Sequence, residues 1–183
     1  MKIIGGKFKG RNFYMPAGIR PTQGVLRAAI FDIIGHDLEG LSMLELYAGS
    51  GAITFEAISR GLTQGVMVEH NPKNVEVIRE NCGLLGIPLG EQYHVVCGDA
   101  MATLKHFAVE KRQFDIVFFD PPFGLKLGKK TLNLATSRDI LTGHKIVVAQ
   151  VDKGDYLTVP EGFNVLIDRC YGTSHLLILQ HVS

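Results

Sequence analysis

A doubly wound α/β fold with a mostly parallel, seven-stranded sheet is predicted by three features of the sequence. Short, near-continuous apolar runs recur from residue 43 onward, and segments with helical periodicity separate them. Such runs are typical of strands in a parallel sheet that helices cover on both faces. The last two runs are joined by only a short connection, which predicts an antiparallel pair at one edge. We therefore expect a Rossmann-like sheet, preceded by a small β-hairpin and a helix.

The first residues predict this hairpin and helix. The segment MKIIGGKFKGRNFYMP alternates apolar and basic residues around Gly-Gly and Lys-Gly turn signals, and it ends at Pro16. Thr22 can cap a helix that runs to about Ile34 and stops at Gly35. The predicted buried face of this helix consists of Val25, Leu26, Ala29, Ile30 and Ile33.

Strands and helices then alternate along the chain. Asn71 and Pro72 supply a cap and a first residue for one of the helices. Strands are predicted at residues 43–47, 65–69, 93–99, 114–120 and 144–151. Helices are predicted at residues 52–61, 73–86, 101–111 and 129–141. The antiparallel pair is predicted at residues 163–172 and 173–182.

The length and composition indicate a protein with one substantial core. Within its 183 residues we assign 1–38 to a basic extension and 39–183 to the main domain. Apolar runs stay short of the roughly 18 residues of a membrane span, and the start lacks a signal-peptide pattern. Three dispersed cysteines, Cys82, Cys97 and Cys170, predict reduced, buried thiols without a metal. We expect a cytoplasmic monomer that does not bind membranes.

Charge is distributed unevenly along the chain. Residues 1–31 hold six Lys or Arg and no acid, so they carry +6, whereas the rest carries 13 − 18 = −5. This asymmetry suggests an extension that binds a polyanion, and a solvated basic surface without a partner is the alternative. The candidate contact residues are Lys7, Lys9, Arg11, Arg20 and Arg27.

Small and acidic residues follow the first three predicted strands, at the edge where open α/β sheets bind ligands. The Ala-Gly-Ser-Gly run at 48–51 lets a ligand approach the backbone, Glu69 can accept both hydroxyls of a ribose, and Asp99 can accept an adenine amine. The alternatives to ligand binding are structural: a tight turn for the Ala-Gly-Ser-Gly run, and a helix cap for Glu69 or Asp99. The combination favours S-adenosylmethionine over NAD. The candidate cofactor-binding residues are Glu45, Tyr47, Ala48, Gly49, Ser50, Gly51, Glu69, His70, Asp99, Ala100 and Asp120.

The fourth predicted strand ends in Asp-Pro-Pro-Phe at residues 120–123. This motif behind an Ala-Gly-Ser-Gly loop resembles the class I methyltransferases that modify amino groups. Together with IIGGKFKGR, GIRPT, ELYAGSGAITFEAISRG and YGTSHLLIL, it resembles the RsmD-like 16S ribosomal RNA guanine-N2 methyltransferases over nearly the whole chain. The resemblance implies a methyltransferase domain, S-adenosylmethionine as cofactor, and ribosomal RNA or a small-subunit assembly particle as partner. It also implies that the basic N-terminal element and the Arg20-Pro21-Thr22 segment contact RNA or shape the mouth of the cofactor site.

Amino-group methylation needs the residue types of this motif. The Asp120 carboxylate and the Pro121 carbonyl can accept the two N–H groups of an exocyclic amine, and the prolines fix the backbone that aims them. Phe123 offers a ring on which a base can stack. These three residues are the predicted catalytic residues.

Two departures from the family pattern leave other functions open. The segment QGVLRAAIF keeps only Arg27 of the family's usual charged run, and Gln150 stands where the family tends to have Glu. One alternative is an amino methyltransferase with another acceptor, such as DNA adenine, a protein amide or a small molecule. Another is a non-catalytic nucleotide- or RNA-binding module with the same fold.

Overall fold

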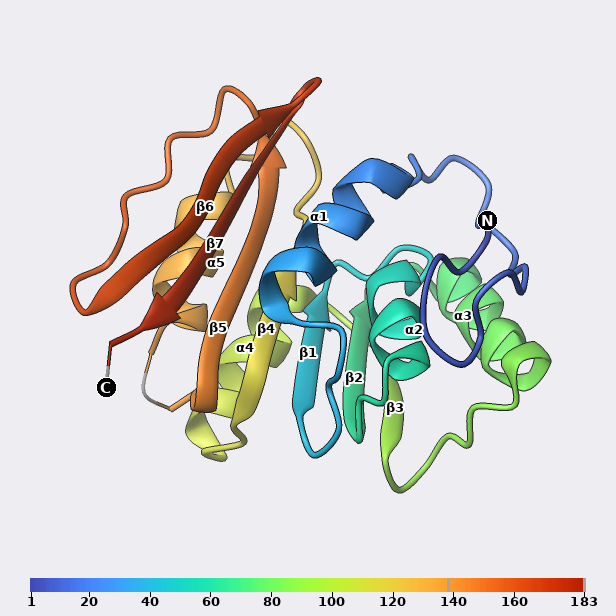
Figure 1. Ribbon diagram of the computed structural model, residues 1–183. Coiled ribbons are helices and arrows are strands. Elements are labelled where there is room, and N and C mark those ends of the chain that lie inside the picture. The colour runs from blue at the N-terminus through green and yellow to red at the C-terminus, as the bar shows by residue number, and fades with distance from the viewer. Residues whose placement is uncertain (138, 183) are drawn as a thin grey trace.

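Seven strands form one sheet in the order β3-β2-β1-β4-β5-β7-β6 in the computed structural model, which describes residues 1–137 and 139–182 (Figure 1). The five strands from β3 to β5 are parallel to their neighbours, and β7 pairs antiparallel with both β5 and β6. The predicted fold and its antiparallel edge are confirmed. The strands are β1 Ser42–Leu46, β2 Gln64–Glu69, β3 Tyr93–Cys97, β4 Phe114–Phe119, β5 Leu141–Asp152, β6 Phe163–Tyr171 and β7 Ser174–His181.

Five helices cover the two faces of this sheet (Figure 1). Buried apolar residues of α1, α2 and α3 form a core on one face, and those of α4 and α5 form a core on the other. The described helices include none that is long and apolar enough to cross a membrane. The helices are α1 Gly24–Ile34, α2 Ala52–Ser59, α3 Pro72–Leu85, α4 Ala100–Val109 and α5 Gly128–Ala135.

Local sequence signals fix α3 at both ends. The Asn71 side chain accepts a hydrogen bond from the Lys73 backbone N–H at 3.0 Å, and Pro72 is the first helical residue, as predicted. Gly86 ends the helix with a φ of 71°, a conformation that glycine adopts without strain. The predicted helix at 129–141 is shorter, because it ends at Ala135 and β5 begins at Leu141. Arg138, within that predicted range, lies outside the described residues.

The prediction for α1 is wrong in two respects. Gln23, not Thr22, is the N-cap residue. Val25 and Ile33, predicted to be buried, are exposed, whereas Arg27 and Phe31 are buried. The apolar periodicity misplaced the face because Arg27 finds a buried ion-pair partner and packs toward the core.

The N-terminal segment folds back on itself in a short antiparallel pairing, so the predicted β-hairpin is present only between residues 1–3 and 11–13. A single antiparallel bridge joins Lys2 to Asn12, and the Met1 ammonium donates to the Phe13 carbonyl at 2.7 Å. Ile3 and Phe13 are both buried in the core that α1, α2 and α3 share. The assignment of residues 1–38 as a separate unit stays a prediction.

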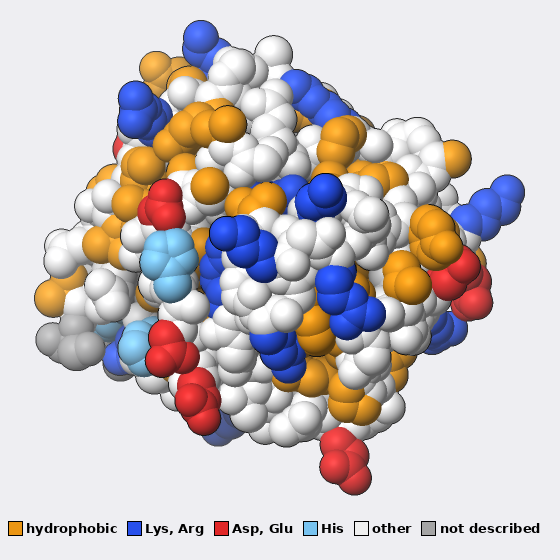
Figure 2. Space-filling model, turned by 45° about the vertical axis from the view of Figure 1, so that its right-hand side comes forward, with side chains coloured by type: hydrophobic (Ala, Val, Ile, Leu, Met, Phe, Trp, Pro, Cys, Tyr) orange, Lys and Arg blue, Asp and Glu red, His pale blue; other side chains and the backbone are white. Residues whose placement is uncertain are grey.

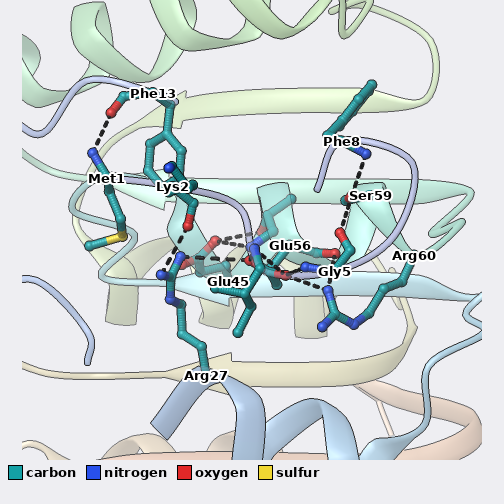
Figure 3. A network of polar contacts seen from close by, with 12 residues as sticks. Met1, Lys2, Gly5, Phe8, Phe13, Arg27, Glu45, Glu56, Ser59 and Arg60 are labelled. Carbon is teal, nitrogen blue, oxygen red and sulfur yellow. Dashed lines mark hydrogen bonds and ion pairs between the residues drawn. The ribbon is translucent and has the colours of Figure 1, made fainter. Parts of the chain in front are cut away.

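A buried carboxylate, Glu56 of α2, holds this loop in place (Figure 3). It accepts hydrogen bonds from the backbone N–H groups of Ile4 and Gly5 at 2.8–3.1 Å. It also forms ion pairs with Arg27, at 3.6 Å, and with Arg60. Because Arg27 is buried in this cluster and donates to the Lys2 carbonyl, the prediction that it contacts RNA is wrong.

The Gly-Gly pair of the loop packs directly on the last turn of α2. A Cβ atom on Gly6, whose φ is 71°, would lie 1.8 Å from the Ser59 carbonyl oxygen. A Cβ on Gly5 would lie 2.4 Å from the Arg60 guanidinium. The backbone of the loop can therefore approach the helix this closely only because residue 6 is glycine, whereas a side chain at residue 5 would displace the Arg60 guanidinium.

All three cysteines are free thiols, as predicted. Cys82 is buried, but Cys97 and Cys170 are exposed, so their predicted burial is wrong. Among the described residues, there is no group of three or more His, Cys, Asp or Glu side chains that could hold a metal ion.

We predict that Glu56→Gln destabilises the fold by about 3–5 kcal/mol, because it leaves two buried guanidinium groups without a counter-charge. The free energy of unfolding, measured in urea, checks this. Glu76→Gln is the matched control, since the Glu76–Arg79 ion pair lies at the surface of α3, where such pairs contribute less than about 1 kcal/mol. Equal effects of the two substitutions would contradict the prediction.

Candidate active site

A cleft of about 330 Å³ opens at the carboxyl ends of β1, β2 and β4. Ligands bind at this edge in open α/β sheets. The predicted site residues that line it are Tyr47, Gly49, Glu69, His70, Asp120, Pro121 and Phe123, and Arg20 lies among them. Predicted catalytic and cofactor-binding residues therefore share one cavity.

The loop between β1 and α2 needs glycine at two positions. Gly49 and Gly51 have φ angles of 56° and 74°, in the left-handed region. A Cβ on Gly51 would meet the Met67 sulfur at 3.0 Å and the Phe55 ring at 3.2 Å. The tight-turn alternative is thus true of this loop, and the same turn brings the Gly49 backbone to the cleft wall.

Glu69 fixes this loop to the end of β2. The side chain is buried, and its Oε2 atom accepts a hydrogen bond from the Gly49 N–H at 2.8 Å. Its Oε1 atom accepts from the Asn71 N–H at 2.9 Å and from the Asn74 side-chain amide at 3.4 Å. The His70 Nδ1 atom lies 3.2 Å from the same oxygen. Oε1 thus has three polar neighbours, whereas Oε2 accepts only from Gly49 and keeps one of its two lone-pair sites for a further donor.

Asp120 lies half-buried where β4 ends, between the cleft and two smaller cavities. Burial raises the pKa of Asp120 to about 7, and the nearby Arg20 guanidinium acts in the opposite direction. Pro121 is buried, whereas Phe123 is 46% exposed. The Arg20 guanidinium carbon lies 5.6 Å from the centre of the Phe123 ring.

Glu45 lies below the loop, in a cavity of about 40 Å³ whose wall includes Asp120. Its carboxylate accepts hydrogen bonds from the Thr54 N–H, at 3.0 Å, and the Thr54 hydroxyl, at 2.5 Å. Burial raises the pKa of Glu45 to about 7, although the bonds from Thr54 oppose this shift, and the charge of Asp120 adds to it. Glu45 thus holds the first turn of α2. Ala48 and Ser50 line the same cavity.

Asp99 and Ala100 are not among the described residues that line the cleft. The Asp99 side chain accepts a hydrogen bond from the Ala102 N–H at 2.8 Å and so caps α4. This is the helix-cap alternative that the sequence left open, and Ala100 is buried in the first turn. Their contact with an adenine ring stays a prediction.

The sequence did not assign residues 17–19, or Asn71 and Asn74 at the start of α3, to the cofactor site. Ala17, Gly18 and Ile19 line the cleft, and a Cβ on Gly49 would touch the Ile19 methyl group at 3.4 Å. No pattern in the sequence pairs this segment with the glycine loop. Asn71 and Asn74 could have been found, since their spacing of three residues puts both on one face of the first helical turn.

Basic side chains gather on the face that includes the N-terminal segment. Lys7, Lys9, Arg11 and Arg20 are exposed, and Figure 2 shows Lys and Arg side chains together near the centre of one face, with acidic side chains toward its margins. Arg11 donates to the Leu84 and Leu85 carbonyls at the end of α3. Contact of these exposed residues with RNA stays a prediction.

Comparison with known proteins identifies relatives along nearly the whole chain. The family described as Conserved hypothetical protein 95 matches residues 1–180. The Bacillus subtilis protein named "Putative rRNA methyltransferase YlbH" is 32% identical over 155 residues, which cover 84% of this chain and 83% of the relative. Ribosomal RNA small subunit methyltransferase D of Escherichia coli K12 is 28% identical over 175 residues, which cover 94% of this chain and 85% of the relative.

A solved structure is also similar to this chain over its whole length. The structure described as "Putative methyltransferase yhhF from Escherichia coli" has a TM-score of 0.85 and 27% sequence identity, and the match covers 100% of this chain and 98% of that one. The predicted resemblance is confirmed by these matches. This chain belongs to the RsmD-like family described as Conserved hypothetical protein 95.

Proposed function

We propose that this protein is an S-adenosylmethionine-dependent methyltransferase that acts on the N2 amine of a guanine in small-subunit ribosomal RNA. One observation carries the proposal: the cleft joins the glycine loop fixed by Glu69 to the Asp-Pro-Pro-Phe end of β4. The E. coli relative is named for the methylation of small-subunit ribosomal RNA. The exposed basic residues of the N-terminal segment suit a phosphate backbone as partner.

The described cleft residues suit this cofactor. The buried Glu69 carboxylate offers acceptors to ribose hydroxyls, and the left-handed Gly49 leaves the backbone open to a ligand. Arg20 is the single Lys or Arg among the described residues that line the cleft, as suits a cofactor without phosphate groups. S-adenosylmethionine supplies, when bound, an electrophilic methyl group on a positively charged sulfur.

The residues at the end of β4 hold and activate the acceptor. The Asp120 carboxylate and the Pro121 carbonyl accept the two N–H groups of the amine, which directs its nitrogen lone pair into the cleft and stabilises the positive charge that develops on it. A carboxylate with a pKa of about 7 can also take up the proton that the nitrogen releases. The exposed Phe123 ring stacks on the base.

Asp120→Ala is expected to abolish methyl transfer to small-subunit ribosomal RNA, because the amine loses its charged acceptor. Cofactor binding should change less than about threefold, since Glu69 and the glycine loop remain. A tritium-transfer assay measures the first quantity and calorimetry with S-adenosylmethionine the second. Asp32→Ala, at an exposed position of α1, is the control. Normal transfer by Asp120→Ala would rule out the proposed role.

Glu69→Gln should weaken cofactor binding by about tenfold, because a neutral amide replaces the charged acceptor of two hydroxyl groups. The amide oxygen can still accept from the Gly49 N–H and so hold the loop, whereas the amide NH2 group cannot accept from the Asn71 N–H at the other end. Calorimetry gives the dissociation constant, and Glu76→Gln in α3 is the matched control. An unchanged dissociation constant would contradict this prediction and show that Glu69 only stabilises the loop.

The rate of transfer should rise with pH through about 7, because the protonated Asp120 carboxyl cannot stabilise the positive charge that develops on the nitrogen or take up its proton. Arg20 lowers the pKa of Asp120, so Arg20→Gln should move the midpoint of this rise to higher pH. Single-turnover rates at saturating RNA, measured from pH 5.5 to 9, check the shift. A midpoint that stays in place would exclude this coupling.

A further inference from the structure

A second cavity, of about 30 Å³, lies beside the cleft and shares Asp120, Arg20 and Phe123 with it. Its other walls come from α1, the end of β5 and the turn between β6 and β7. Such a volume holds about one water-sized group. It can therefore receive the edge of a ring that lies in the cleft, but not a whole nucleobase.

Gln150 is the polar side chain that this cavity leaves unsatisfied. It is 6% exposed, and its Oε1 atom is buried and accepts no hydrogen bond from any residue within 1–137 or 139–182. Buried acceptors in folded proteins almost always have a partner. A buried amide oxygen beside a reactive carboxyl group therefore points to a donor that arrives with a ligand.

The strand register explains why Gln150 and Asp120 face the same cavity. Phe119 of β4 is paired with Ala149 of β5 in parallel register, so the next residue of each strand lies side by side. Side chains of paired residues point to the same face of a sheet. This is the face that α1 covers, because Phe118 and Val148 belong to the core on the α1 side.

We propose that Gln150 reads the N1–H edge of the target guanine and so determines which base is methylated; this rests on the proposed function. In guanine the N2 amine is followed along the base edge by the N1–H donor and then by the O6 acceptor. With the amine at Asp120, the N1–H group points toward Gln150 Oε1. The amide N–H of Gln150 can then donate to O6.

Other bases with an exocyclic amine do not fit this arrangement. Adenine and cytosine both carry a ring nitrogen without hydrogen, an acceptor, next to the amine. Gln150 can donate to that acceptor only by turning its amide group over, and its oxygen then has no donor, so these bases form one hydrogen bond where guanine forms two. The carboxylate and carbonyl pair recognises an amine in general, whereas Gln150 recognises the guanine edge.

The test uses an oligoribonucleotide that spans the guanine methylated by the wild-type protein, and a second one with 2-aminopurine at that position. 2-Aminopurine keeps the amine but has an acceptor at N1 and lacks O6. The wild-type protein should methylate guanine at least about tenfold faster in single turnover. Gln150→Met, of similar volume but without a hydrogen-bonding group, should reduce this preference at least fivefold. Gln150→Glu should keep it, because it retains the acceptor for N1–H.

Gln180→Met, at the opposite end of the same sheet, is the control for effects on folding. Comparison between variants cancels the intrinsic difference in reactivity of the two bases. An equal preference in the wild-type protein and Gln150→Met would overturn the proposal and leave the methyltransferase function intact. Should Gln150→Met not fold, a wild-type preference below about twofold rejects the proposal by itself. A wild-type protein that methylates no guanine would overturn the function and the inference together.

Discussion

The parallel register of β1, β2, β4 and β5 is the constraint on which the rest of the site depends. Leu46 is paired with both Val68 and Phe119, and Phe119 is paired with Ala149, so β1, β2 and β4 end at one edge and β5 continues past it to Asp152. The loop after β1, the Glu69 end of β2 and the Asp120 end of β4 meet there as a result. Candidate site residues that are spread over about a hundred positions of the sequence therefore meet in one cleft, and no long loop is needed to bring them there.

The sequence predicted best what neighbouring residues decide. Asn71 and Pro72 start a helix by local chemistry, and apolar runs mark the strands that are buried on both faces. The buried face of α1 could not be predicted, because it depends on Glu56, a residue 29 positions after Arg27 that neutralises this arginine in the core. Asp99 shows the reverse case. Its role as a helix cap can be predicted from the neighbouring residues, whereas a role in binding a ligand cannot.

Two carboxyl groups with raised pKa values face the same small cavity below the glycine loop. Burial raises the pKa of Glu45 and of Asp120 to about 7, and the charge of Asp120 raises that of Glu45 further. A cation placed near them reverses this balance, since it stabilises both ionised forms. The site therefore favours a positively charged group. This preference comes from the two buried carboxyl groups and not from exposed residues.

The short helix α2 joins the two ends of this architecture. Its first turn follows the glycine loop and binds the Glu45 carboxylate, and its second half binds the N-terminal segment through Glu56 and Ser59. Eight residues of helix span about 12 Å. The spacing between the N-terminal segment and the glycine loop at the cleft is therefore fixed by a rigid helix of about two turns.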